Sequence, residues 1–203
     1  MQRERLDGSI FYPGFQLPSC VKAFSGPLLI LGTARCLLDD LDRYGTPPGD
    51  VFAVKQAGLF YWRFRHWWVS DTTDWPLWHN LVVNSSKSQA FGVPFSVHAL
   101  TAFPGKEIDY HWQFNPRIAR SAGPEATIAA LAMGYDPIVL AGMPGDGTGH
   151  FFPDQRYKPG LEPMDYGEGE HRVQWEILER EIFKGRVKSM SGLTREILGE
   201  PVR

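Results

Sequence analysis

The turn after the first apolar run of the chain has the groups that bind a phosphate. The run covers residues 27–31, and Gly32-Thr33-Ala34-Arg35 follows it. Gly32 permits a sharp turn and a close approach of the backbone to a ligand. The helix expected next offers free backbone N–H groups at its start, and the Arg35 guanidinium can bind a phosphate in a bidentate manner. The alternative is a plain strand-to-helix turn, because one glycine is not the Gly-x-Gly-x-x-Gly motif.

Two further segments also follow apolar runs. Lys55 and Gln56 come after the run 51–54, where their polar side chains are placed to bind a base, a sugar or a phosphate. The alternative is that they belong to a solvated loop. Gly142 comes after the run 138–141 and opens a segment with four glycines between 142 and 149, which also contains Asp146 and is followed by His150. Asp146 is a candidate acid, base or metal ligand. One aspartate and one histidine do not make a metal site, so no metal is assigned, and a flexible glycine loop is the alternative.

Two helix starts add candidate groups. Ser121 precedes a helix predicted over 122–133, where it can cap the N-terminus, and Gly123 lies in the first turn. His171 lies at the start of a helix predicted over 170–183, beside Glu168 and Glu170. A histidine is suited to general-base catalysis because its charge changes near neutral pH. His171 is therefore the candidate base, and a solvated surface residue is the alternative.

The elements that must position these groups alternate between strand and helix. Short apolar runs predict strands at 27–31, 51–54, 66–70, 81–83, 96–100, 138–141 and 186–189. Helical periodicity predicts helices at 37–44, 122–133, 170–183 and 191–198, and the first should bury Leu37, Leu38, Leu41 and Tyr44. Residues 71–80, 101–120 and 142–169 are expected to be loop or irregular structure.

Alternation of this kind predicts an α/β fold, a Rossmann-like three-layer αβα arrangement with a mostly parallel sheet. Ligands then bind outside the carboxyl ends of the strands. Residues 1–26 are expected to form an irregular N-terminal lead-in, and residues 27–203 a single Rossmann-like nucleotide-binding domain.

Composition excludes several classes of protein. The net charge is −2, which gives no nucleic-acid footprint, and no apolar run approaches the length that spans a membrane. The two cysteines, Cys20 and Cys36, form no metal-ligand pattern, so a reducing compartment, the cytoplasm, is expected.

Four stretches together resemble the bacterial sialyltransferase-like superfamily, which includes related 6-hydroxymethyl-dihydropterin pyrophosphokinases. They are residues 29–35, 50–56, 121–123 and 129–142. The resemblance implies that a nucleotide lies near Gly32, Thr33, Lys55, Gln56, Ser121 and Gly123, and that His171 is the general base. The chain departs from the family pattern in the ligand-facing loops. Gly32 is not followed by Pro-Ser, Lys55 stands in place of Asn, and Met143-Pro144-Gly145 precedes Asp146.

Three functions follow as hypotheses. The first is a transferase that uses a nucleotide-activated donor, most simply a glycosyltransferase, with Gly32, Thr33 and Arg35 at the phosphates. The second is Mg²⁺-dependent pyrophosphokinase or nucleotidyl chemistry, which would need carboxylates at the loops, for which Asp146 and Asp71 are candidates. The third is a non-catalytic Rossmann-like protein of phage assembly, because the chain also resembles short phage and prophage proteins. Under that hypothesis it would bind other phage proteins or form a homo-oligomer, in the host cytoplasm or the virion.

Overall fold

A computed structural model describes residues 10–61, 63–70, 75–84, 94–101, 107–115, 118–119, 121–146 and 168–202. Its centre is a sheet of seven strands in which every pair of neighbours is parallel. The strands are β1 (Leu28–Leu31), β2 (Asp50–Val54), β3 (His66–Val69), β4 (Ser96–Leu100), β5 (Tyr110–Trp112), β6 (Ile138–Ala141) and β7 (Val187–Ser189). The predicted α/β class is confirmed, with a sheet that is parallel throughout.

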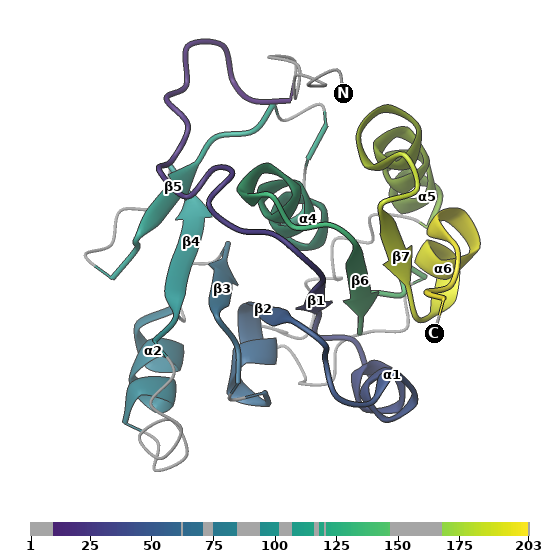
Figure 1. Cartoon of the computed structure of the whole chain (residues 1–203), viewed down its shortest axis with the longest axis horizontal. Helices are drawn as coiled ribbons and strands as arrows, with labels where there is room; N and C mark the ends of the chain where they lie inside the picture. Colours follow the sequence, from purple (N-terminus) through teal and green to yellow (C-terminus); the bar gives the residue numbers. More distant parts are fainter. Residues whose placement is uncertain are drawn as a thin grey trace, which may run out of the picture.

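Helices cover both faces of this sheet. They are α1 (Leu37–Tyr44), α2 (Trp75–Val83), α4 (Ala122–Met133), α5 (Glu168–Leu178) and α6 (Gly192–Leu198). A 3₁₀ turn, η1 (Lys55–Leu59), follows β2, and a π-helical turn, η2 (Glu179–Phe183), continues α5. Figure 1 shows α4 and α5 on one side of the row of strands and α1 and α2 on the other. The fold is therefore the predicted three-layer αβα arrangement.

The alternation of side chains along β1 explains the two cores. Leu28 and Ile30 pack in the core beneath α4, whereas Leu29 and Leu31 pack in the opposite core with α1 and α2. All four residues are buried, as expected for a strand with helices on both faces.

The order of the strands creates a switch point. The order is β5-β4-β3-β2-β1-β6-β7, so the chain builds the sheet outward from β1 to β5 and then returns to the other side of β1 with β6. In open α/β sheets, ligands bind at the carboxyl edge where the strand order reverses. Here that point lies between β1 and β6. Because α4 and α5 each lead into a parallel strand, their N-termini lie at this same edge.

Three sequence predictions were wrong. Residues 81–83 are the end of α2 and not a strand, and part of the expected loop 71–80 belongs to the same helix. Trp75, Trp78 and Val82 are buried at helical spacing, but Leu77 and Leu81 are exposed and apolar, so the helical period is hidden in the sequence. The stretch expected to be irregular contains β5, whose three residues are too few to show a period.

The burial pattern of α1 also differs from the prediction. Leu38 is half exposed, whereas Asp40 is 1% exposed. The helix is turned so that the Asp40 carboxylate, and not Leu38, points inward.

Residues 10–26 pack against the α4 side of the sheet. Phe11 forms an antiparallel bridge with Phe114, and Ile10 and Cys20 are buried in the core beneath α4. The backbone N–H groups of Lys22 and Phe24 donate to carbonyls at the end of α4. Among the described residues, no helix is both long and apolar enough to cross a bilayer.

Candidate functional site

The turns after β1 and β6 touch each other at the switch point. Gly32 N donates to Ala141 O over 2.8 Å, and Ala34 N donates to Gly142 O over 3.0 Å. A Cβ at Gly32 would overlap the Gly142 carbonyl oxygen and the Met143 side chain. The contact between the two turns therefore requires glycine at position 32, whether or not a ligand binds there.

Buried Asp40 fixes the position of the β6 turn. Gly142 has φ +67°, a left-handed conformation that favours glycine, and its N–H donates to Asp40 Oδ2 over 2.8 Å. The Ser191 hydroxyl donates to the same oxygen over 2.8 Å, and Arg43 forms an ion pair with Oδ1 over 2.7 Å. One carboxylate thus joins α1 to the turns after β6 and β7, which is why α1 turns Asp40 inward.

The N-terminus of α4 lies beside these turns. Ser121 occupies the N-cap position with an extended backbone, but its side chain makes no capping hydrogen bond. The first backbone N–H groups of a helix have no partner within it, and they carry the positive end of the helix dipole. A Cβ built on Gly123 would lie 3.3 Å from the Met143 sulfur and 3.7 Å from the Trp175 ring. Gly123 therefore allows close packing of the β6 turn and α5.

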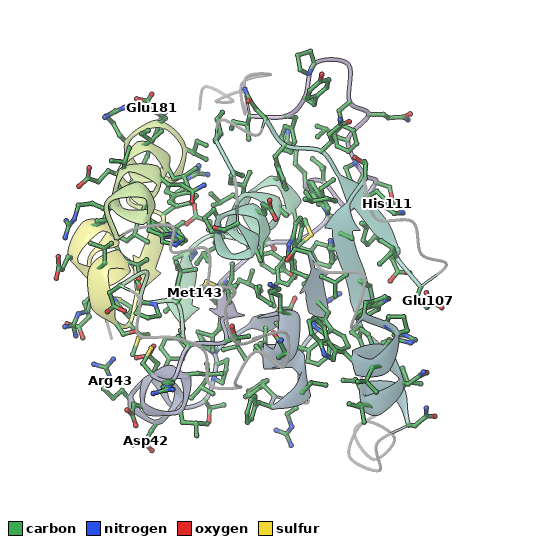
Figure 2. All side chains as sticks on the ribbon, turned by 180° about the vertical axis from the view of Figure 1, so that it is seen from behind. Asp42, Arg43, Glu107, His111, Met143 and Glu181 are labelled. Atoms are coloured by element: carbon green, nitrogen blue, oxygen red, sulfur yellow. The ribbon has the colours of Figure 1, made fainter. Side chains whose placement is uncertain are left out.

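Met143 lies between the β1 turn at Gly32 and the start of α4 at Gly123, the two backbone segments predicted to bind a phosphate. A Cβ built on Gly32 would overlap the Met143 Cγ, one built on Gly123 would lie 3.3 Å from the Met143 sulfur, and the side chain packs partly buried against the core beneath α4. Figure 2 shows Met143 well inside the outline of the molecule, whereas Asp42 and Glu181 lie on its rim. The space between the β1 turn and the start of α4 thus contains a flexible apolar side chain.

Lys55 follows β2 at the same edge in a left-handed conformation, with φ +52°. Such a conformation is uncommon for a residue with a side chain, and it costs free energy that the surroundings must supply. The Lys55 carbonyl accepts a 2.7 Å hydrogen bond from Trp67 Nε1, which fixes the backbone there. The side chains of Lys55 and Gln56 are half-buried.

Glu125 is the charged neighbour of Lys55 and was not predicted as a site residue. It lies in the first turn of α4 and is 6% exposed. Burial raises its pKa to about 7, although the Trp68 indole and the Lys55 ammonium nearby partly oppose this rise. The sequence held one signal: Glu125 is the only acidic residue in a helix that is otherwise apolar or small.

The remaining predicted residues lie around the same edge. Thr33 is half-buried and Arg35 is exposed, both in the turn before α1. Asp146 is exposed beside Gly192, at the start of α6. His171 is half-buried in α5, one helical turn before Trp175, which packs near both Gly123 and Gly145.

Some candidate groups lie outside the described residues, namely His150 and Asp71. Within the described ranges, no three His, Cys, Asp or Glu side chains form a cluster suited to a metal ion.

The amino edge of the sheet carries a second polar network that the sequence did not predict. His66 Nδ1 lies 2.7 Å from the Ser96 hydroxyl and 3.2 Å from His98 Nε2, and His66 Nε2 lies 2.9 Å from the Tyr135 hydroxyl. Tyr135 donates to Asp50 over 2.6 Å. Burial lowers the pKa of His66 to about 4 and also lowers that of His98, so both rings are neutral at pH 7.

Among known proteins, the chain is similar to solved structures but to no family model or curated sequence. One similar solved structure is the sialyltransferase CST-II with a trisaccharide acceptor and CMP. It has a TM-score of 0.53 and 17% sequence identity, and the match covers 86% of this chain and 85% of that chain. Another is CstII from Campylobacter jejuni with a substrate analogue, cytidine-5'-monophosphate. It has a TM-score of 0.53 and 16% sequence identity, and the match covers 86% of this chain and 84% of that chain. The chain therefore has a sialyltransferase-like fold.

Proposed function

We propose that this protein binds a nucleotide at the carboxyl edge of its sheet and transfers a glycosyl group from a nucleotide-activated donor. The observation that carries the proposal is the meeting of the β1 turn, the β6 turn and the N-terminus of α4 at the switch point. Structures of the same fold with CMP support the choice of a cytidine nucleotide as the first ligand to test.

The predicted residues have definite roles in this proposal. The backbone N–H group of Gly123 at the start of α4, with Thr33 and Arg35 in the β1 turn beside Gly32, binds the phosphate of the donor. His171 takes the proton of the acceptor hydroxyl as the acceptor oxygen bonds to the sugar carbon. The bond from that carbon to the phosphate oxygen breaks, and its electron pair leaves with the nucleotide. Lys55 offsets the charge that develops on the phosphate.

Met143 sets a condition for binding. A phosphate at the start of α4 would share the space that the Met143 side chain fills between Gly32 and Gly123. Methionine has three rotatable side-chain bonds and repacks at low cost. Ligand entry therefore displaces this side chain, and Met143→Ala should bind CMP more tightly than the native protein.

Thermal denaturation with CMP, CDP, UDP and GDP tests the proposal. A ligand at one hundred times its Kd adds about 2.7 kcal/mol, which raises the Tm of a protein of this size by about 5–10 °C. Lys55→Gln should reduce the shift. Lys184→Gln is a matched control, because Lys184 has nearly the same left-handed backbone, φ +50°, at the opposite edge. No shift with any of the four nucleotides would refute the proposal.

The other hypotheses stay predictions from the sequence. The magnesium-dependent chemistry needs carboxylates at the loops, and of the candidates Asp146 and Asp71 only Asp146 is among the described residues. A role in assembly needs a partner surface, and the exposed apolar side chains of α2 are Leu77, Leu81 and Val83. The cellular compartment and a phage origin likewise stay predictions.

A further inference from the structure

Glu125 is a buried acid with an unsatisfied oxygen. Every residue of α4 from Pro124 to Met133 is buried, and Glu125 is the only one of them with an ionisable side chain. It is 6% exposed, and its Oε2 atom has no hydrogen-bond partner among the described residues. Leaving such an atom unpaired in the interior costs about 1–3 kcal/mol, so an apolar residue would serve the fold better.

A second unpaired group faces the same place. Trp68, in β3, is fully buried; its indole Nε1 faces the Glu125 carboxyl but makes no hydrogen bond of normal geometry within the described chain. Phe52 and Phe114 pack against its ring, which fixes the indole. The indole and the Lys55 ammonium are the groups from β3 and η1 that act on the Glu125 carboxyl. An acceptor and a donor thus meet between the start of α4 and β3, and the positive charge of Lys55 acts on the same carboxyl.

The chemistry of these groups selects the ligand atom. A carboxylate oxygen accepts a hydrogen bond, while an indole N–H and an ammonium only donate. A hydroxyl can donate to Glu125 and accept from Trp68 or Lys55 through the same oxygen. A phosphate or carbonyl oxygen cannot donate to the carboxylate, and an exocyclic amine is a poor acceptor. With Glu125 ionised, the groups therefore fit a hydroxyl.

The position of these groups relative to the switch point indicates which part of the ligand carries the hydroxyl. β3 lies two strands from β1, which is about 10 Å. A phosphate at the β1 turn does not reach that far, but a sugar attached to it does. The hydroxyl belongs either to the ribose or to the transferred sugar.

We propose that Glu125, with the Trp68 N–H, binds a sugar hydroxyl of the nucleotide-activated donor. This inference rests on the proposed function, since it assumes a nucleotide ligand at the same edge of the sheet. It adds a binding residue that has no counterpart among the residues the sequence predicted.

Calorimetric titration of matched variants tests this inference. The variants are Glu125→Gln, Trp68→Phe and, as a control, Glu181→Gln, which makes the same change at a 59% exposed carboxylate. The ligands are CMP, its 2'-deoxy and 3'-deoxy analogues, and a CMP-sugar. Losing a hydrogen bond to a charged group should weaken binding about 10- to 100-fold in Glu125→Gln, and Glu181→Gln should bind as the native protein does.

The deoxy ligands distinguish the two sources of the hydroxyl. If Glu125 binds the ribose, removing one ribose hydroxyl weakens binding to the native protein but causes no further loss in Glu125→Gln. If it binds the transferred sugar, only the CMP-sugar loses affinity in Glu125→Gln. Circular dichroism of each variant checks that the fold is kept.

Two outcomes refute different claims. If the native protein binds CMP and Glu125→Gln binds every ligand equally well, the role of Glu125 is wrong and the proposed function stands. If the native protein binds no nucleotide or nucleotide-sugar, the proposed function fails, and this inference fails with it.

Discussion

Glu125 should make the stability of the ligand-free protein fall as the pH rises. Its pKa is about 7 in the folded protein, against 4.5 for an ordinary glutamate. Because the folded state holds its proton more tightly, the unfolded state loses that proton first, and the free energy of unfolding decreases between about pH 4.5 and pH 7. The shift corresponds to about 3 kcal/mol once both states are ionised. Glu125→Gln removes this dependence.

Urea denaturation of both proteins at pH 5, 6, 7 and 8 measures the effect. The stability of Glu125→Gln minus that of the native protein should grow by about 2–3 kcal/mol from pH 5 to pH 8. Because both proteins contain the other groups that titrate in this range, including His66, the contributions of these groups cancel in the difference. The cost of burying the amide of Glu125→Gln does not depend on pH, so it does not affect how the difference changes with pH. A difference that does not change with pH would show that Glu125 ionises as in water, and the reasoning about its burial would be wrong.

Three further predictions concern the frame of the site and the second polar network. Gly32→Ala should destabilise the protein by about 3 kcal/mol in urea denaturation, because its Cβ overlaps the backbone at Gly142; a stability equal to the native value would contradict this contact. Asp40→Ala should cost about 2–4 kcal/mol, since it leaves the Gly142 N–H without an acceptor, and exposed Asp39→Ala should cost almost nothing. His66 should remain neutral at pH 5 in NMR spectra of its ring nitrogens, because burial lowers its pKa to about 4, and stability should fall as the pH drops from 6.5 to 4; a ring that titrates near pH 6.5 would refute this.

The strands next to the switch point were predictable from the sequence because they are buried on both faces. β1, β2 and β6 appear as continuous apolar runs, each followed by glycine or a polar residue. The turn residues of the candidate site follow from the same rule, since the carboxyl ends of parallel strands share one edge. Helix α2 was missed because apolar residues cover its exposed side as well as its buried side.

Asp40 and Glu125 could not be predicted because their importance depends on tertiary contacts. In the sequence, Asp40 is one of several acids in an amphipathic helix, and only the packing of α1 against the β6 turn shows that it points inward. Glu125 looks like an ordinary acid in a first helical turn. Its burial depends on which face of β3 lies beneath α4, and hence on the placement of Trp68. His66 and His98 meet only through the register of β3 and β4.

Backbone NMR with CMP tests most directly whether a nucleotide binds at the switch point. Adding CMP should shift the amide signals of Gly32, Thr33, Gly123 and Gly142, and the signals of Asp50 and Arg65 at the opposite edge should stay in place. Shifts confined to that opposite edge, or no shifts at millimolar CMP, would contradict the assignment of the carboxyl edge as a nucleotide site.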